Sequence, residues 1–595
     1  RNGRPEWLEC SALGVSGGWN PNVHLASHHR GRPVWSEDHL AFLPGGDLPP
    51  GMSVAGAAAG KGSTHAALAD GAAQARAALE SLGLSARELP LPKAEDAPLS
   101  QAAVWHVPGR GRAWVDFQND VTVKDIALAH KENMRPVEHL KRWTTLGMAT
   151  DQGKTANVTA LAVMAELTGK EIPQTGTTIF RPPYTPVAMS VLGGGDTGPD
   201  FRPTRLTPTH AWAKARGAEF VEVGQWMRAQ YFPRDGETHW RQSVDREAKA
   251  VRSGVGLCDV TTLGKIDVQG ADAAVFLDRI YSNMISTLKV GRVRYGLMLR
   301  EDGFVYDDGT CARMAEDHFV VTTTTGNAGL VFRNMEFARQ CLWPDLDVQV
   351  ISTTDAWAQI AVAGPNARTL LSRLVDDGFD LSSAAFPFMA CGDLTICGGL
   401  RARLFRISFS GELAYEIAVP ARYGNALMQR LTERGQDLGV TPYGTEALAV
   451  LRIEKGHAVA AEINGQTTAA MLGLGRMVSG KKDSIGAVMS RREGLAEDRR
   501  RLVGLMPVDP SQQVMAGAHL FEPGAEQTTA TDQGWVTSSC FSPHLGSYIA
   551  LGFLEEGDSR MGDVVIAANP LAGVNLETKV VSPHFVDPEG ERLRD

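Results

Sequence analysis

The sequence predicts a multidomain protein of mixed α/β and α+β class, and three observations support this prediction. The chain has 595 residues, whereas a single hydrophobic core rarely serves more than about 250–300 residues, so we expect roughly three or four domains. After residue 205, short β-like runs alternate with helical segments. A stretch rich in proline and glycine, from Arg181 to Pro199, predicts a linker before that region.

Composition and charge narrow the class of protein. With 43% hydrophobic and 21% charged residues, the chain is typical of soluble globular proteins. The net charge of -9, without a dense Lys/Arg run, argues against nucleic acid or an anionic membrane as the main partner. The seven cysteines are scattered and form no CxxC, so neither a disulfide framework nor a metal site is predicted. With no membrane-length apolar run and no signal segment, we expect a cytoplasmic protein.

Residues 1–90 end in a predicted strand–turn–helix unit. Strand-like pieces at 34–36 and 40–43 precede a Gly/Ala-rich turn and an Ala-rich helix that begins at Ser63 or Thr64, where a hydroxyl can cap it. Such a turn lets a phosphate or ribityl chain approach backbone N–H groups, although a plain strand–turn–helix is an equal alternative. Because the chain starts at Arg1 within what looks like the tail of a domain, we expect more protein before it.

This unit resembles the last piece of a dinucleotide-binding flavoprotein or pyridine-nucleotide domain, in which a Gly-Asp pair after a strand closes over the dinucleotide. The GxGxxG that opens such a domain is missing here and would lie before Arg1. The resemblance implies NAD-binding residues at Asp47, Ala55, Gly56, Ala57 and Thr64.

Residues 110–185 predict a small helical domain. One helix follows Val121-Thr122, and a second covers 137–141. The outline resembles the bacterioferritin-associated-ferredoxin-like domain, in which four thiolates hold a two-iron cluster. The four matching positions are Asp116, Gln118, Asp151 and Ala156. Without thiolates that cluster cannot form, so we expect a retained scaffold that has lost its metal.

Residues 295–308, YGLMLREDGFVYDD, predict a hairpin. An apolar run meets a polar turn, and a second run, Phe304–Tyr306, stops on the acid pair Asp307 and Asp308. Because Asp disfavours sheets and favours turns, the pair can serve only to end the strand. The alternative is a carboxylate pair placed for chemistry.

Six segments after residue 205 favour that alternative because they occur in the order of one known family. They are LCDVTTLGKIDVQG, YGLMLREDGFVYDD, AVAGPNA, SFSGELAYEI, LRIEKG and GWVTSSCFSPHLGSYIALGF. The region resembles the aminomethyltransferases, the T-protein family of the glycine cleavage system, which bind tetrahydrofolate in a central funnel. The resemblance implies a folate-binding domain over residues 205–490 and a β-rich C-terminal domain over residues 500–595.

Together with the N-terminal segments, this order more specifically resembles the alpha subunits of heterotetrameric sarcosine oxidases. The resemblance implies NAD and tetrahydrofolate on this chain, FAD and covalent FMN on a beta subunit, and smaller gamma and delta subunits. It also implies oxidative demethylation of sarcosine to glycine on the beta subunit, with hydrogen peroxide formed. The one-carbon unit would pass to tetrahydrofolate as 5,10-methylenetetrahydrofolate, or leave as formaldehyde without folate.

Site residues follow from the family motifs one at a time. Asp308 matches the essential acid near the reacting folate nitrogen, although a shift by one would give Asp307. Tyr295 matches a folate-contacting tyrosine, with a core aromatic as the alternative, and Thr324 matches a residue against the pterin, with simple β-propensity as the alternative. Glu416 matches the glutamate that binds the pterin ring, whose adjacent N–H donors suit a carboxylate. Its alternative is a solvated charge on a strand face.

Two positions depart from the family. Phe409 replaces a tyrosine, so a hydroxyl contact is lost while ring stacking with the cofactor can survive. Leu448 replaces an arginine that grips the folate tail, so tail binding must rest on other basic residues.

The implied chemistry is capture of an electrophilic iminium by a folate amine before water hydrolyses it. Asp308 would orient that amine and stabilise its developing positive charge. Two alternatives stay open. The chain can be the alpha subunit of a related N-methyl amino acid oxidoreductase, or a non-catalytic scaffold for a flavin-bearing partner, which the lost cluster cysteines and Leu448 favour.

Overall fold

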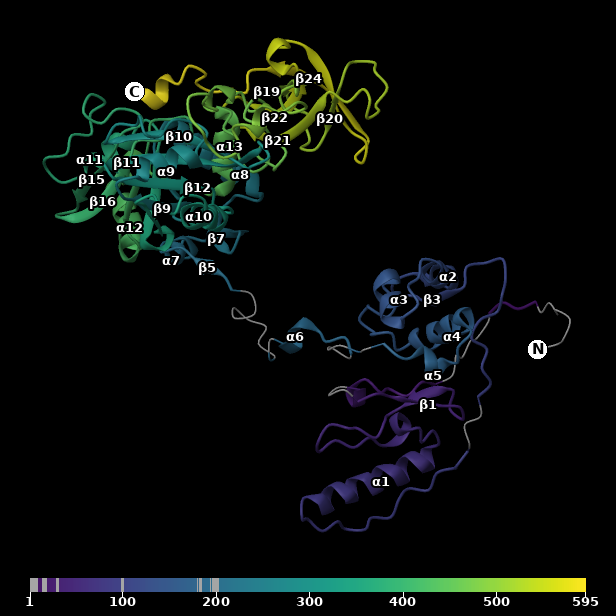
Figure 1. The fold of residues 1–595 in the computed structure, drawn as a ribbon. Helices are drawn as coiled ribbons and strands as arrows, with labels where there is room; N and C mark the ends of the chain where they lie inside the picture. The colour runs from purple at the N-terminus through teal and green to yellow at the C-terminus, as the bar shows by residue number, and fades with distance from the viewer. Residues whose placement is uncertain are drawn as a thin grey trace. The chain divides into compact units, whose positions relative to one another are not determined.

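The computed structural model describes residues 9–12, 19–27, 31–97, 101–178, 180, 185–192, 194 and 203–595. It divides into two compact units, Arg1–Phe201 and Arg202–Asp595 (Figure 1). Most of the predicted linker lies outside the described residues, and α6 (Met189–Leu192) belongs to its described part. Across the described ranges, every helix is too short or too polar to span a lipid bilayer.

The first unit begins with the predicted strand–turn–helix elements. Strand β1 (Val34–Ser36) pairs antiparallel with β2 (Ala41–Leu43), and the 3-10 helix η2 (Gly56–Ala59) precedes α1 (Thr64–Ser81). Ser63 caps α1, because its side chain accepts a hydrogen bond from the backbone N–H of Ala66 at 3.0 Å. The two strands and the capped helix predicted from the sequence are therefore confirmed.

The helical part of the first unit is built on two strands and four helices. Figure 1 shows α2, α3 and α4 gathered together. The element bounds are β3 (Trp114–Asp116), β4 (Val121–Thr122), α2 (Val123–Lys131), α3 (Val137–Thr144), α4 (Asn157–Thr168) and α5 (Ile172–Thr175). Thr122 and Asp125 form a capping box at the start of α2. Ile126, Leu140 and Met164 are fully buried between the helices.

At two of the four positions that match cluster ligands, Asp116 and Asp151, the side chain accepts hydrogen bonds from loop backbone groups. The Asp116 carboxylate accepts backbone hydrogen bonds from Gln118 (2.9 Å) and from Gly147 (2.8 Å). Asp151 accepts a hydrogen bond from the backbone N–H of Gly153 (3.2 Å), and Ala156 is buried in the core. In the described ranges no three His, Cys, Asp or Glu side chains gather as a metal site.

The second unit contains two large sheets. The five-stranded sheet has the order β10-β11-β12-β9-β13, and the six-stranded sheet has the order β15-β16-β17-β14-β8-β18. Apolar side chains from both sheets, including Val293 and Ala312 on one and Phe405 and Ala418 on the other, form one cluster that joins them.

The strands of these two sheets have the following bounds: β8 (Gly256–Asp259), β9 (Gly264–Gln269), β10 (Arg292–Leu299), β11 (Val305–Ala315), β12 (His318–Thr323), β13 (Gln349–Ser352), β14 (Trp357–Ala363), β15 (Cys391–Ile396), β16 (Leu400–Phe405), β17 (Ala414–Pro420) and β18 (Thr441–Pro442). A smaller sheet, β5-β7-β6, contains β5 (Arg205–Leu206), β6 (Glu219–Val223) and β7 (Trp226–Tyr231).

Helices cover the sheets: α7 (His210–Lys214), α8 (Trp240–Ser253), α9 (Ala273–Ile280), α10 (Ala328–Phe337), α11 (Ala367–Ser372), α12 (Gly424–Arg434) and α13 (Thr445–Lys455). Helices α9 and α10 bury Phe276, Leu277 and Met335 against the five-stranded sheet. Helices α8 and α13 cover one face of the six-stranded sheet, where Leu448 packs with apolar neighbours.

The C-terminal region closes into a six-stranded barrel of order β19-β22-β21-β20-β23-β24, which Figure 1 shows in green to yellow. Its elements are β19 (Arg500–Pro507), β20 (His519–Phe521), β21 (Gly534–Ser542), β22 (Ser547–Glu555), β23 (Val564–Asn569) and β24 (Val574–Val581), followed by α14 (Glu591–Arg594). Helix α13 ties the barrel to the sheets, because Glu454 accepts a hydrogen bond from Ser542 at 2.6 Å and Arg452 donates one to Ser538 at 2.6 Å.

One expectation about the central hairpin was wrong. Strands β10 and β11 form the predicted antiparallel pair, but β11 does not stop at the acid pair and runs on to Ala315. The strand tolerates both aspartates because each carboxylate finds donors: Asp307 from Thr324 and Asn327, and Asp308 from Tyr295. The acid pair therefore lies inside a continuous strand.

Candidate functional site

Asp307 and Asp308 point to opposite faces of β11, because successive side chains of a strand alternate. Asp307 is 1% exposed, and its carboxylate accepts hydrogen bonds from the hydroxyl and backbone N–H of Thr324 (2.8 and 3.2 Å) and from Asn327 Nδ2 (3.0 Å). Asn327 is the N-cap residue of α10. Asp307 therefore fixes the connection between β12 and α10, and its acceptor capacity is used within the protein.

Asp308, in contrast, keeps one carboxylate oxygen without a hydrogen-bond partner in the described residues. Its Oδ2 accepts a hydrogen bond from the Tyr295 hydroxyl at 2.8 Å, whereas its buried Oδ1 has no partner among the residues that the structure describes. Burial, with a smaller contribution from the charge of Asp307, raises the pKa of Asp308 to about 7, although the Tyr295 bond opposes this. The side chain can therefore both accept and release a proton near neutral pH.

Tyr295 donates a hydrogen bond to Asp308 and does not itself ionise. Burial and the neighbouring Asp308 carboxylate raise the pKa of its phenol, so the hydroxyl stays a donor. Its ring belongs to the apolar cluster that contains Leu297, Leu299 and Val305. The two residues, 13 positions apart in the sequence, are therefore in direct contact across the hairpin.

Glu416 lies on β17 in the six-stranded sheet and is 8% exposed. Its Oε2 accepts a hydrogen bond from Gln359 Nε2 on the neighbouring strand β14. Burial raises the pKa of Glu416, while the Gln359 bond and the positive charge of Lys265 lower it. Sequence reasoning missed Gln359 and Lys265, because a strand glutamine and a strand lysine carry no local signal of their contacts.

Two other predicted residues have different surroundings. The Thr324 hydroxyl donates to Asp307, so its side chain is already engaged. Phe409 is 37% exposed and stacks on His457, with ring centroids 5.5 Å apart. Burial, then the charges of Lys455, His584 and Arg452, lowers the pKa of His457 to about 4, so the stacking partner is a neutral imidazole. No contact between Glu416 or Phe409 and Asp308 is described.

The predicted NAD residues lie in the first unit. The backbone N–H of Gly56 donates to the Asp70 carboxylate at 2.9 Å, and the helix N-terminus is capped by Ser63. In this structure the Asp70 carboxylate therefore takes up a backbone N–H group that a phosphate would otherwise use. The remaining predicted residues are exposed: Asp47, Ala55, Ala57 and Thr64.

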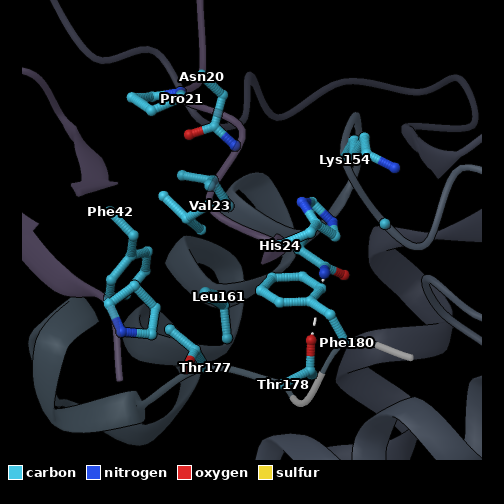
Figure 2. Close-up of a pocket in the computed structure, with 14 residues that line it drawn as sticks. Asn20, Pro21, Val23, His24, Phe42, Lys154, Leu161, Thr177, Thr178 and Phe180 are labelled. Carbon is cyan, nitrogen blue, oxygen red and sulfur yellow. Dashed lines mark hydrogen bonds between the residues drawn. The ribbon is translucent and has the colours of Figure 1, made fainter. Parts of the chain in front are cut away.

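A small cavity also lies in the first unit, shown in Figure 2. His24 and Phe180 face each other there with ring centroids 3.9 Å apart, and Asn157 donates to Thr178 at 3.2 Å. Its volume of ≈ 30 Å³ suits about two water molecules rather than an organic ligand.

Three family models match the chain. The GCVT N-terminal domain matches residues 209–482, the glycine cleavage T-protein C-terminal barrel domain matches residues 500–587, and the sarcosine oxidase A3 domain matches residues 110–196. These matches confirm the predicted fold class, which combined an aminomethyltransferase-like domain, a small domain and a β-rich C-terminal domain.

Individual proteins agree with these models. Sarcosine oxidase subunit alpha of Rhizobium meliloti (strain 1021) is 50% identical over 99% of this chain, which spans 60% of that protein's length. An aminomethyltransferase of Geobacillus sp. (strain WCH70) is 30% identical over 64% of this chain and 98% of its own. The crystal structure of glycine cleavage system aminomethyltransferase T from Bartonella henselae superposes with a TM-score of 0.54 at 25% identity, covering 64% of this chain and 98% of that one. The chain therefore belongs to the aminomethyltransferase family, and along almost its whole length it is a relative of the sarcosine oxidase alpha subunits.

Proposed function

We propose that this chain is the folate-binding part of a sarcosine oxidase alpha subunit and catalyses the one-carbon transfer half of the reaction. The observation that carries the proposal is the Asp308 carboxyl group: its pKa is about 7, Tyr295 fixes one oxygen, and the other oxygen is buried without a partner in the described chain. A buried acceptor without a donor is costly unless a ligand supplies one, and an amine N–H would do so.

Bound tetrahydrofolate would supply an amine that captures an electrophilic one-carbon unit. Asp308 Oδ1 would accept a hydrogen bond from that amine and take up its proton as the amine loses it. Tyr295 holds the carboxyl group in one orientation through the 2.8 Å bond to Oδ2. Glu416 would accept the N–H groups of the pterin edge, and the exposed ring of Phe409 offers a stacking surface.

The oxidation that produces the electrophile needs a redox partner, since the motifs of this chain supply only transfer chemistry. We assign that step to a flavin-bearing beta subunit with FAD and FMN, with gamma and delta subunits completing a heterotetramer. Sarcosine would be demethylated there to glycine, with hydrogen peroxide formed. The relatives named sarcosine oxidase subunit alpha support a sarcosine oxidase of more than one subunit. NAD binding stays a prediction of the family resemblance.

A scaffold role is the second candidate. Leu448 packs among apolar neighbours of α8 and α13, where the T-protein family has an arginine, and this observation favours weaker folate binding.

Turnover of the assembled complex with sarcosine and tetrahydrofolate separates the two candidates. We expect Asp308→Ala to return the one-carbon product to free formaldehyde while sarcosine oxidation continues. The control is Asp302→Ala at the hairpin tip, where the carboxylate pairs with Arg300 and accepts a hydrogen bond from the backbone N–H of Phe304; its removal should leave the folate product unchanged. Equal folate product from the Asp308→Ala complex and the wild-type complex would refute the catalytic role.

A further inference from the structure

A buried lysine, Lys265, forms hydrogen bonds to backbone carbonyls of the turn between β8 and β9. Lys265 is 2% exposed, and its Nζ donates hydrogen bonds to the backbone carbonyls of Thr261 (2.6 Å) and Leu263 (2.9 Å). Burial lowers the pKa of Lys265 to about 8, although the charges of Asp259, Glu416 and Asp355 oppose this. A buried ammonium is costly, and two carbonyl acceptors offset only part of that cost.

Backbone hydrogen bonds at Gln359 connect the same turn to β14. The backbone N–H of Gln359 donates to Thr261 Oγ1 at 3.0 Å, and the Gln359 carbonyl accepts from the backbone N–H of Val260 at 2.9 Å. With both backbone groups fixed, the Gln359 side chain is 1% exposed and donates to Glu416. Lys265 is thus linked to Glu416 by three consecutive hydrogen-bonded contacts, through Thr261 and Gln359.

Lys265 also acts on Glu416 through its charge, which lowers the pKa of the Glu416 carboxyl group. The other titratable groups that interact with Glu416 are Cys258 on β8 and Tyr443 beside β18. Burial raises the pKa of Cys258 to about 12 and raises the pKa of Tyr443, so both stay neutral at pH 7. Lys265 is therefore the positive charge that opposes protonation of Glu416 in this group of side chains.

We propose that Lys265 and Gln359 are positioning residues that keep Glu416 ionised and correctly oriented to accept paired N–H groups from a heterocyclic ring. This inference rests on the proposed function and deepens it, because it names the residues that select a ring edge with adjacent donors. An ionised carboxylate accepts two such donors together, whereas a protonated one must donate at one oxygen. Ligand binding should therefore weaken when Glu416 takes up a proton.

The test measures binding of 5-formyltetrahydrofolate, a stable reduced pterin, to the full chain in its complex between pH 6 and pH 9. We expect Lys265→Met to weaken binding by up to about tenfold at pH 6, since a rise of one unit in the pKa of Glu416 corresponds to a factor of ten. Towards pH 9 the two proteins should converge, because Glu416 is then ionised in both. Lys265→Arg should bind like the wild type across this range, because a guanidinium stays protonated.

The matched control is Lys482→Met. Lys482 is a partly buried lysine whose pKa burial likewise lowers to about 8, and its Nζ donates to the carbonyls of Asp278 and Tyr281. Its removal should leave the pH dependence of binding unchanged. If Lys265→Met fails to fold, Gln359→Leu replaces it in the test and should also weaken binding by up to about tenfold at pH 6.

The outcomes distinguish this inference from the function on which it rests. A constant ratio of wild-type to Lys265→Met affinity from pH 6 to pH 9 would overturn the positioning role while leaving folate binding intact. Wild-type affinity in Glu416→Gln, or no binding to the wild-type complex, would instead overturn the folate site and this inference with it.

Discussion

Removing the Tyr295 hydroxyl should shift the pH dependence of one-carbon transfer towards higher pH. In the wild-type protein this hydroxyl donates to Asp308 Oδ2 at 2.8 Å and stabilises the ionised carboxylate. A hydrogen bond to a charged group is worth about 1.5–3 kcal/mol, which corresponds to about 1–2 units of pKa. Tyr295→Phe should therefore raise the pKa of Asp308 from about 7 to about 8–9.

The sign follows from which form of Asp308 is active. In the proposed mechanism transfer needs ionised Asp308, so activity is lost as the pH falls through the pKa of Asp308, and a higher pKa moves that loss to higher pH. The assay follows the fraction of one-carbon product on folate, rather than as formaldehyde, between pH 6 and pH 10. Tyr306→Phe is the control, because this half-buried phenol lies in the same hairpin and no contact with Asp308 is described for it. An unchanged midpoint in Tyr295→Phe, or a shift to lower pH, would refute the reasoning.

Two further predictions concern the acid pair. Because the pKa of Asp308 is raised in the folded state, the wild-type protein loses stability as the pH rises from about 4 to about 7. In denaturant unfolding, the free energy of unfolding of Asp308→Asn should equal that of the wild type at pH 4 and exceed it by about 2–4 kcal/mol at pH 8. Equal stability of the two proteins at pH 8 would contradict the raised pKa. Asp307→Ala leaves the donors of Thr324 and Asn327 without their acceptor, so it should lower the free energy of unfolding by about 2–4 kcal/mol. It should also move the transfer midpoint to lower pH, since the Asp307 charge raises the pKa of Asp308, and a midpoint that stays in place would exclude this coupling.

Local signals predicted the elements of this fold well. The hydroxyl before α1, the Val121-Thr122 pair before α2 and the polar turn of the central hairpin each act over a few residues. The end of β11 was mispredicted, because the donors that satisfy Asp307 come from residues 17 and 20 positions further along the chain.

The sequence by itself determined the order of the aminomethyltransferase-like and barrel domains and the antiparallel hairpin around its polar turn, since turn residues act locally. The contact of Tyr295 with Asp308 came from the structure. Only the tertiary structure decided which aspartate is engaged internally and which keeps a buried oxygen without a partner. It also decided that Gln359 meets Glu416 across 57 residues of chain and that Lys265 lies beside them. The physical reason is that burial and charge depend on strands brought together by packing, and no local pattern of residues records that packing.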